Sequence, residues 1–114
     1  MHELGLMTGI LKQVEQAARE AGAVRITCIR LVAGEMTEVL PEALEFALEA
    51  LGAGTLAEGA TLVVEQPRPR SRCTQCGYEF EHDRFHWMCP VCQALATELL
   101  AGRELYIKDM EIER

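Results

Sequence analysis

The sequence predicts an α/β fold in which two helices pack on a three-stranded mixed sheet, with a small cysteine-rich domain inserted before the last strand. Three observations support this prediction. Segments with helical and strand-like patterns alternate along residues 1–66. Proline and arginine then alternate in "PRPRSRC" at 67–73, and four of the five cysteines lie between positions 73 and 92. A strand-like segment closes the chain at 103–114.

Two segments have the apolar spacing of amphipathic helices. The first, at 4–22, has an apolar residue every three or four positions and reaches Gly22, a common helix stop. The second, at 41–54, begins with Pro41, which suits the first turn of a helix. The predicted core stripes are Leu4, Met7, Leu11, Val14, Ala18 and Ala21 in the first helix, and Leu44, Ala47, Leu48 and Leu51 in the second.

Three segments predict the strands of the sheet, namely 23–34, 59–66 and 103–114. The segment at 67–73 predicts an extended linker, neither a helix nor a central strand, because its prolines disfavour both. We therefore expect one domain made of residues 1–66 and 103–114, and an inserted domain with its linkers at 67–102.

Composition and charge narrow the classes of partner. A formal net charge of −7 disfavours nucleic acid, whose binding depends largely on Lys and Arg. The chain has no apolar run of about 18 residues that could span a membrane, and no signal-peptide pattern. We therefore expect a cytoplasmic protein that binds neither nucleic acid nor membrane. In such a reducing compartment, Cys-x-x-Cys motifs favour metal binding or redox chemistry over structural disulfides.

The most specific signal is the pair of motifs "CTQC" at 73–76 and "CPVC" at 89–92. Two such turns can bring four thiolates onto one ion, and a tetrahedral four-sulfur shell suits structural Zn²⁺. The predicted zinc ligands of this zinc-ribbon-like domain are Cys73, Cys76, Cys89 and Cys92. An iron site and a redox pair are the alternatives. Cys28 stands alone in a predicted strand and is interpreted as a buried, small apolar residue.

The N-terminus can bind a second metal ion. The Met1 α-amine and the backbone nitrogen and imidazole of His2 can close on one ion, with the backbone nitrogen or carboxylate of Glu3 as the fourth donor. Planar nitrogen donors suit Ni(II) or Cu(II). Such a site weakens as the pH falls, because a backbone nitrogen binds metal only after losing its proton. The alternative is a solvated terminal histidine without function.

His82 and His86 lie between the cysteine motifs, where a hairpin or loop is expected. The first interpretation is an exposed loop pair. Nickel binding or pH sensing, and replacement of a cysteine in the zinc shell, are the alternatives. The arginines at 68, 70 and 72 predict a solvated linker, with docking of an acidic partner as the alternative.

Together these features resemble the HypA/HybF family of nickel metallochaperones, which serve [NiFe]-hydrogenase maturation. The resemblance rests on "MHE" at the start, "CTQC" and "CPVC" in one insert, and the closing "ELYIKDMEIE". It implies that His2 is the essential nickel ligand, assisted by the Met1 amine and Glu3, and that the four cysteines hold structural zinc. In some members a histidine of the zinc domain also reaches the nickel, and His82 and His86 are the candidates here.

The predicted function is therefore that of a Ni(II) carrier, not an enzyme. A closed four-cysteine site leaves no coordination position for catalysis, and the sequence has no nucleophile–base pattern and no P-loop. The resemblance implies a HypB-type GTPase and the hydrogenase large subunit as partners, and urease maturation proteins in some members. The chain is expected to be a monomer or a homodimer. The competing prediction is a zinc-ribbon adaptor for protein interactions that has no role in metal delivery.

Overall fold

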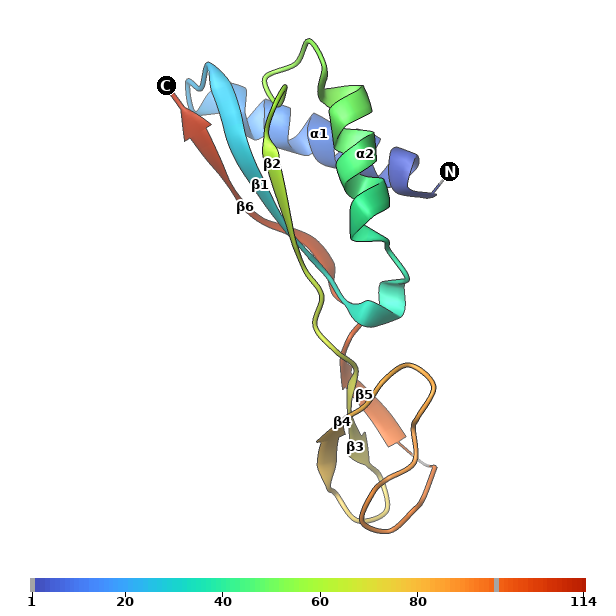
Figure 1. Ribbon diagram of the computed structural model, residues 1–114. Coiled ribbons are helices and arrows are strands. Elements are labelled where there is room, and N and C mark those ends of the chain that lie inside the picture. The colour runs from blue at the N-terminus through green and yellow to red at the C-terminus, as the bar shows by residue number, and fades with distance from the viewer. Residues whose placement is uncertain (1, 96) are drawn as a thin grey trace. The chain divides into compact units, whose positions relative to one another are not determined.

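The structure of the protein is a computed structural model that describes residues 2–95 and 97–114. The chain divides into two compact units (Figure 1). The first unit comprises Met1–Leu31, Val39–Val64 and Tyr106–Arg114, and the second comprises Val32–Glu38 and Glu65–Leu105. No helix among the described residues is long and apolar enough to cross a membrane.

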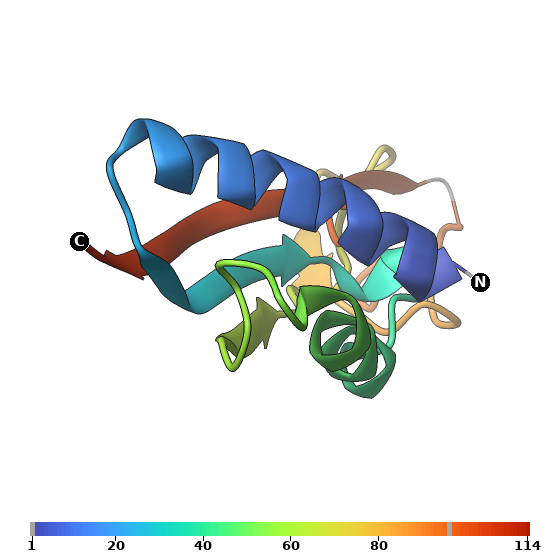
Figure 2. The ribbon, with the colours of Figure 1, turned by 90° about the horizontal axis from the view of Figure 1, so that it is seen from above.

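Two helices, α1 (His2–Glu20) and α2 (Pro41–Gly52), form the helical layer of the first unit (Figure 2). The first starts two residues before the predicted boundary, and Glu3 lies in its first turn, where a negative charge is favourable. It ends close to the predicted stop. Gly22 takes a φ of 76°, and the N–H of the next residue, Ala23, donates to the carbonyl of Ala18 at 2.9 Å. The second helix begins at Pro41, as predicted.

The sheet of the first unit contains β1 (Arg25–Ala33), β2 (Thr61–Glu65) and β6 (Leu105–Glu113) in the order β2-β1-β6. The two helices also pack against each other. They bury Met7, Ile10, Leu11, Val14 and Ala18 from α1, and Leu44, Ala47 and Leu48 from α2. The predicted fold class is thereby confirmed. Ala21 and Leu51 are exposed, against the prediction, because one follows the end of α1 and the other lies in the last turn of α2.

One ion-pair network fastens β6, which follows the cysteine motifs in the sequence, to β1, which precedes them. The Arg30 guanidinium donates to Asp109 and to Glu111, both at 2.7 Å. These two carboxylates raise the pKa of Arg30 above its ordinary value, so the pair of strands is joined by a permanent cation. β1 and β6 are hydrogen-bonded neighbours in the sheet, and these ion pairs add contacts between side chains 79 and 81 positions apart in the sequence.

The second unit has an antiparallel sheet of β3 (Arg70–Cys73), β4 (Glu79–Glu81) and β5 (Thr97–Ala101) in the order β4-β3-β5. The prediction of a linker at 67–73 is therefore wrong, because its last four residues form the central strand. Both prolines precede that strand and remove no hydrogen bond from it. Within the strand, Ser71 and Cys73 are buried and the two arginines are exposed, which is the alternation of a one-sided strand.

The turn that follows β1, with its short 3₁₀ helix η1 (Glu35–Thr37), is hydrogen-bonded to both chain segments that flank the cysteine motifs. The backbone N–H groups of Gly34, Glu35 and Met36 donate to the carbonyls of Glu104, Pro67 and Gly102 at 2.7, 2.9 and 2.8 Å. Gly34 has no room for a side chain, since a Cβ there would lie 2.2 Å from the carbonyl oxygen of Gly102. The segments that enter and leave the cysteine-rich part are therefore fixed within the second unit.

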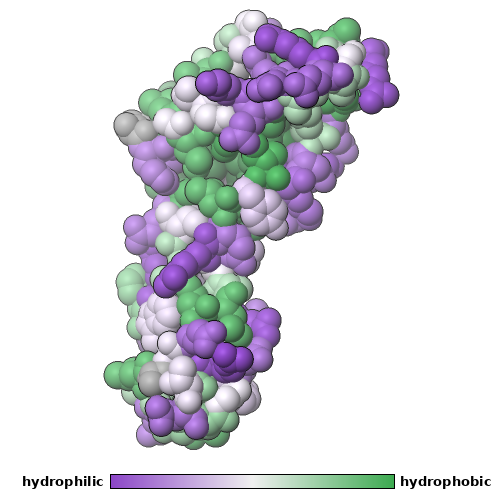
Figure 3. Space-filling model, turned by 180° about the vertical axis from the view of Figure 1, so that it is seen from behind, coloured by the Kyte–Doolittle hydropathy of each residue, from purple (hydrophilic) through white to green (hydrophobic). Residues whose placement is uncertain are grey.

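The cysteine-rich part of the second unit buries little apolar surface. Its buried residues between 65 and 105, among those described, are Pro69, Ser71, Cys73, His82, Cys89 and Gly102. Large apolar side chains are instead exposed, including Phe85 at 76%, Leu95 at 70% and Val91 at 64%. Figure 3 shows such apolar patches on the surface. Among the described residues between 65 and 105 no Leu, Ile, Val or Met is buried, so this part of the unit needs another source of stability.

Candidate metal-binding sites

Four cysteine sulfurs gather at one point of the second unit. The Sγ atoms of Cys73, Cys76, Cys89 and Cys92 all lie within 4.8 Å of one another. The closest pairs run across the two motifs, with Cys73 and Cys92 3.4 Å apart and Cys76 and Cys89 3.6 Å apart. The first cysteine of each motif is buried and the second is exposed. This donor set and spacing suit one tetrahedral metal ion.

The two motifs place their sulfurs by the same backbone turn. In the first, the Cys73 carbonyl accepts from the N–H of Gly77 at 2.9 Å, and Gly77 takes a φ of 80°. In the second, the Cys89 carbonyl accepts from the N–H of Gln93 at 2.8 Å, and Gln93 takes a φ of 65°. Each turn needs a left-handed residue directly after its second cysteine, which glycine supplies without strain and Gln93 supplies at some cost.

Backbone N–H groups within each motif favour the thiolate form of its first cysteine. The N–H of Cys76 lowers the pKa of Cys73 to about 6, and the N–H of Cys92 lowers the pKa of Cys89. The N–H of Ala94 also favours the thiolate of Cys92. Three other causes outweigh that bond: the Cys73 thiol, then burial, then the other two thiols. Together they raise the pKa of Cys92 to about 12. Four thiolates can therefore gather here only around a cation.

The terminal site has a different character. Met1, whose α-amine was predicted as a nickel ligand, lies outside the described residues. His2 begins α1, and its side chain is 61% exposed. The N–H groups in the first turn of a helix have no acceptor within the helix, so the backbone nitrogens of His2 and Glu3 carry no helical hydrogen bond. The imidazole of His2 is therefore accessible, whereas the N–H of Glu3 is hydrogen-bonded to its own carboxylate.

The Glu3 carboxylate, in contrast, is held within the first unit. Its side chain is only 15% exposed, and Oε2 lies 3.7 Å from Nδ1 of His2. The same oxygen accepts a hydrogen bond from the backbone N–H of Leu40, the residue before α2, at 3.4 Å. The N–H of Glu3 itself and then that of Leu40 hold the pKa of this carboxyl below its usual value. His2 therefore has a fixed negative charge beside it.

His82 was predicted to be exposed on a loop. In the structure it is buried, with 6% exposure. Its Nδ1 donates to the carbonyl of Asp83 at 2.5 Å, and its Nε2 accepts from the hydroxyl of Ser71 at 2.7 Å. The centroid of its ring lies 5.4 Å from that of Phe80 and 4.7 Å from that of Trp87. Phe80 and Trp87 therefore pack against the ring of His82, and both of its nitrogens are occupied.

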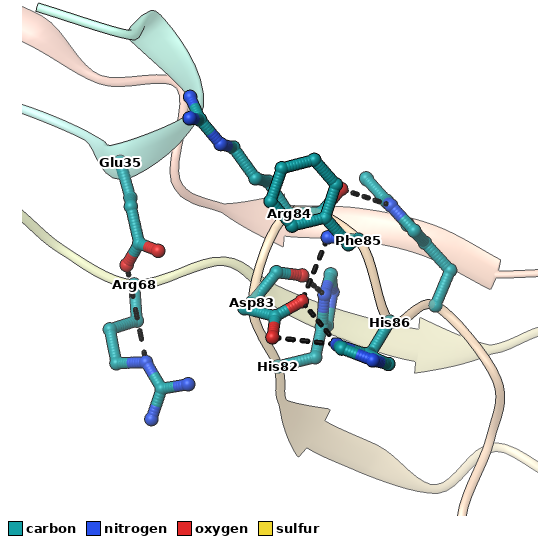
Figure 4. Close-up of polar contacts among 8 residues, drawn as sticks. Glu35, Arg68, His82, Asp83, Arg84, Phe85 and His86 are labelled. Carbon is teal, nitrogen blue, oxygen red and sulfur yellow. Dashed lines mark hydrogen bonds and ion pairs between the residues drawn. The ribbon is translucent and has the colours of Figure 1, made fainter.

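His86 is exposed, as predicted, and its orientation is fixed. Its Nδ1 lies 2.7 and 2.6 Å from the two carboxylate oxygens of Asp83 (Figure 4). Asp83 also accepts the N–H of Phe85 at 2.8 Å, and this bond and then His86 hold the pKa of Asp83 below its usual value. No described residue bonds Nε2 of His86. An imidazole held by a carboxylate, with its other nitrogen free, is the usual arrangement of a metal-binding histidine.

The three arginines between 68 and 72 remain about half exposed, as predicted, but each faces a carboxylate. Arg68 lies 4.0 Å from Glu35 (Figure 4). Arg72 donates to Glu98 at 2.8 Å, and Arg70 pairs with Glu79. Arg70 and Arg72 therefore link β3 to its neighbours β4 and β5, and Arg68 faces η1. Cys28 is buried with 8% exposure, as predicted.

The sequence has clear relatives among known proteins. Residues 1–112 match the family described as "Hydrogenase/urease nickel incorporation, metallochaperone, hypA". The chain is 40% identical over 113 residues to the hydrogenase maturation factor HypA of Chlorobium luteolum, covering 99% of this chain and 97% of that protein. It is 41% identical over 113 residues to the same factor of Chlorobaculum tepidum, covering 99% and 100%.

This chain belongs to the HypA family. The resemblance predicted from "MHE", the two cysteine motifs and the closing strand is thereby confirmed. HypA proteins are described as metallochaperones and maturation factors, so the family is one of accessory proteins in nickel incorporation and hydrogenase maturation.

Two solved structures share the HypA fold. The solution structure of the Ni metallochaperone HypA from Helicobacter pylori has a TM-score of 0.63 and 17% identity, covering 97% of both chains. A second, titled as the solution structure of HypA protein, has a TM-score of 0.71 and 19% identity, covering 98% of this chain and 96% of that chain. At these identities the likeness concerns the fold alone.

Sequence reasoning missed three residues that shape the sites of this HypA chain. Gln93 occupies in the second motif the position of Gly77 in the first, so aligning the two motifs would have marked it as left-handed. Asp83 stands two positions before Phe85, the spacing of an Asp that accepts a backbone N–H in a turn. Leu40 gave no signal, because it acts only through its backbone N–H.

Proposed function

We propose that this HypA chain carries Ni(II) at its N-terminus and delivers it during maturation of a [NiFe]-hydrogenase. The observation that supports this most is an exposed His2 at the start of a helix, in a chain that matches a nickel-incorporation family from residue 1. The proposed nickel ligands are the Met1 amine and His2, with Glu3 contributing. Nickel is the cargo, and the chain performs no catalysis.

The geometry of the first helical turn suits a site that binds and releases. The backbone nitrogens of His2 and Glu3 have no helical acceptor, so nickel would break no helical hydrogen bond by using them. At Glu3 it would replace the bond between that N–H and the residue's own carboxylate. Nitrogen donors in a plane suit Ni(II). Because His2 is exposed, an incoming ligand can replace the donors one at a time. A fall in pH favours release as well, since protons compete for the same nitrogens.

The four cysteines are proposed to hold a resident Zn²⁺. Four sulfurs within 4.8 Å match the soft, tetrahedral preference of this ion. Bound zinc would cross-link the two cysteine motifs within residues 65–105, where no described Leu, Ile, Val or Met is buried. Its role in this proposal is to keep the second unit folded, and it takes no part in the transfer of nickel.

If a histidine of the second unit contributes to nickel binding, we expect it to be His86. Its Nε2 is free among the described residues, and Asp83 fixes the ring from the other side. His82 would first have to give up its bonds to Ser71 and Asp83 and leave the aromatic cluster. Substituting His82 and His86 one at a time therefore shows which of them contributes to nickel binding.

The proposed partners follow from a carrier's need for a source of energy and a recipient. This chain has no P-loop, so nucleotide hydrolysis must come from a partner, and the family resemblance implies a HypB-type GTPase. The recipient is the hydrogenase large subunit, and the family description adds urease as a second destination. The place of action is proposed to be the cytoplasm.

The test is a titration of untagged protein with Ni²⁺, monitored by isothermal titration calorimetry and by the absorption spectrum of bound nickel. We expect one nickel per chain in the wild type, and loss of that site in His2→Ala and in a variant with one residue added before Met1. His82→Ala and His86→Ala test in the same titration whether a histidine of the second unit contributes, and only His86→Ala is expected to weaken nickel binding. If His2→Ala and the extended chain bind nickel as the wild type does, the carrier is refuted and the zinc-ribbon adaptor gains support.

A further inference from the structure

We propose that the Glu3 carboxylate is a positioning group that fastens the nickel-binding terminus to the start of α2, and that it stays outside the ligand set. This inference rests on the proposed nickel site at His2 and assigns a separate role to one of its residues. Position 3 was expected to contribute either a backbone nitrogen or a carboxylate. The surroundings of the carboxylate distinguish between these two possibilities.

Burial gives the first argument. The side chains of His2 and Glu3 are neighbours in the sequence, yet His2 is 61% exposed and Glu3 only 15%. The carboxylate is thus directed into the first unit while the imidazole is left accessible. A ligand that must be reached and released by partners is expected on the exposed side of this pair.

The contacts of Oε2 give the second argument. This oxygen accepts the backbone N–H of Leu40 at 3.4 Å, which joins residue 3 to residue 40. Leu40 is the N-cap residue of α2 and precedes Pro41. Moving the carboxylate onto the metal would release this contact and leave the Leu40 N–H without that acceptor. Keeping it in place anchors the first turn of α1 to a second helix.

The distance to His2 gives the third argument. Oε2 lies 3.7 Å from Nδ1 of His2, close enough to act on the imidazole and on an ion bound to it through charge. Partners of this kind, which hold a ligand without touching the metal, commonly change metal affinity by about 10–100-fold when they are removed. Glu3 can therefore support nickel binding from outside the coordination shell.

Two substitutions separate the contact from the charge. Glu3→Gln keeps an oxygen that accepts the Leu40 N–H and removes the negative charge, whereas Glu3→Ala removes both. Glu45→Gln is the control for removal of a carboxylate charge, because Glu45 lies on α2 in the same unit and, unlike Glu3, is exposed. All variants are made in the untagged, full-length protein.

The first readout needs no nickel. Amide hydrogen exchange of Leu40, measured by NMR on nickel-free protein, is expected to be slow in the wild type, Glu3→Gln and Glu45→Gln, and faster in Glu3→Ala. Unchanged Leu40 exchange in Glu3→Ala overturns the anchoring role, whatever the protein does with nickel.

The second readout is the nickel complex. We expect Glu3→Ala to weaken nickel binding about 10-fold and Glu3→Gln to weaken it less, with the ligand-field absorption maximum of nickel the same in all four proteins. A shift of that maximum in both Glu3 variants would make the carboxylate a ligand and overturn the proposal. Equal affinity in Glu3→Ala and wild type would overturn it too. If the wild type itself binds no nickel, the proposed carrier function fails and the role of Glu3 toward nickel fails with it.

Discussion

The four-cysteine cluster and the N-terminus offer a metal ion two opposite kinds of site. The cluster is assembled in advance: four sulfurs lie within 4.8 Å, two of them buried, and matching backbone turns fix each pair. The terminus presents one exposed imidazole in the first turn of a helix, with only the Glu3 carboxylate held behind it. The first arrangement leaves no open position, and the second leaves most positions open.

This difference shows how one short chain can keep one metal and pass on another. A closed shell of four thiolates releases its ion only if the surrounding backbone opens, so exchange is slow. A site with exposed donors at a chain end can lose them one by one. The proposed zinc is therefore part of the fold of the second unit, and the proposed nickel is cargo held by the first.

The largest expected effect comes from opening the cluster. Cys73→Ser removes a buried ligand from the segment 65–105, where no described Leu, Ile, Val or Met is buried. We therefore expect loss of bound zinc and of ordered structure in that segment. Mass spectrometry measures the zinc content, and the dispersion of amide signals in NMR spectra measures the ordered structure. Cys28→Ser, a buried cysteine of the first unit, is the control and should keep its zinc. Full zinc content and a dispersed spectrum in Cys73→Ser would show that the cluster is not a structural site.

A smaller effect should follow from disturbing the backbone of the second unit without touching a ligand. A Cβ on Gly34 would lie 2.2 Å from the Gly102 carbonyl oxygen, so Gly34→Ala forces the two segments apart. We expect it to lower the free energy of unfolding by about 2 kcal/mol, measured by urea denaturation. Gly9→Ala is the control, since nothing lies within 4 Å of that position in α1, and it should stabilise by up to about 1 kcal/mol. Equal stability of the two variants would contradict this account of the turn.

The smallest effect concerns the Asp83–His86 pair, the second unit's counterpart of the Glu3–His2 pair. The N–H of Phe85 and then His86 hold the pKa of Asp83 below its ordinary value of 3.8. The stability that these bonds give is present above that pH and is lost as the pH falls through the lowered pKa, because protonation removes them. NMR titration of the carboxyl carbon should therefore show a midpoint below 3.8.

Two variants decide which neighbour is responsible for that shift. His86→Ala should raise the Asp83 midpoint only part of the way, because the Phe85 N–H, the larger cause, remains. Phe85→Ala keeps its backbone N–H and should leave the midpoint unchanged. A wild-type midpoint at or above 3.8 would mean that His86 is not held in a fixed orientation.

Much of the fold could be predicted because its signals are local. The apolar spacing in α1, Pro41 at the start of α2 and the two cysteine motifs each report on a few neighbouring residues, and the structure agrees with them. The family could be recognised because short motifs stand at fixed places in a whole-chain pattern. The roles of the terminal residues as nickel ligands stay predictions.

The features that could not be predicted from the sequence depend on contacts that form only in the folded chain. The strand at Arg70–Cys73 was hidden by the prolines before it, and its arginines find their carboxylates on β4 and β5. His82 was taken for an exposed residue, because its burial depends on how the loop folds Phe80 and Trp87 against its ring. Glu3 and Leu40 are 37 positions apart in the sequence, and Leu40 contributes only its backbone N–H. No pattern of side chains could therefore predict this contact.

The most direct test of one permanent and one transferable metal is a chelator challenge on untagged protein that carries both ions. One equivalent of Ni²⁺ is added to protein isolated with its zinc, a chelator is raised stepwise, and both metals are quantified by mass spectrometry alongside amide spectra of residues 65–105. The account predicts that nickel leaves first, with zinc and the spectra of the second unit unchanged. Departure of both metals together, or of zinc before nickel, would contradict it.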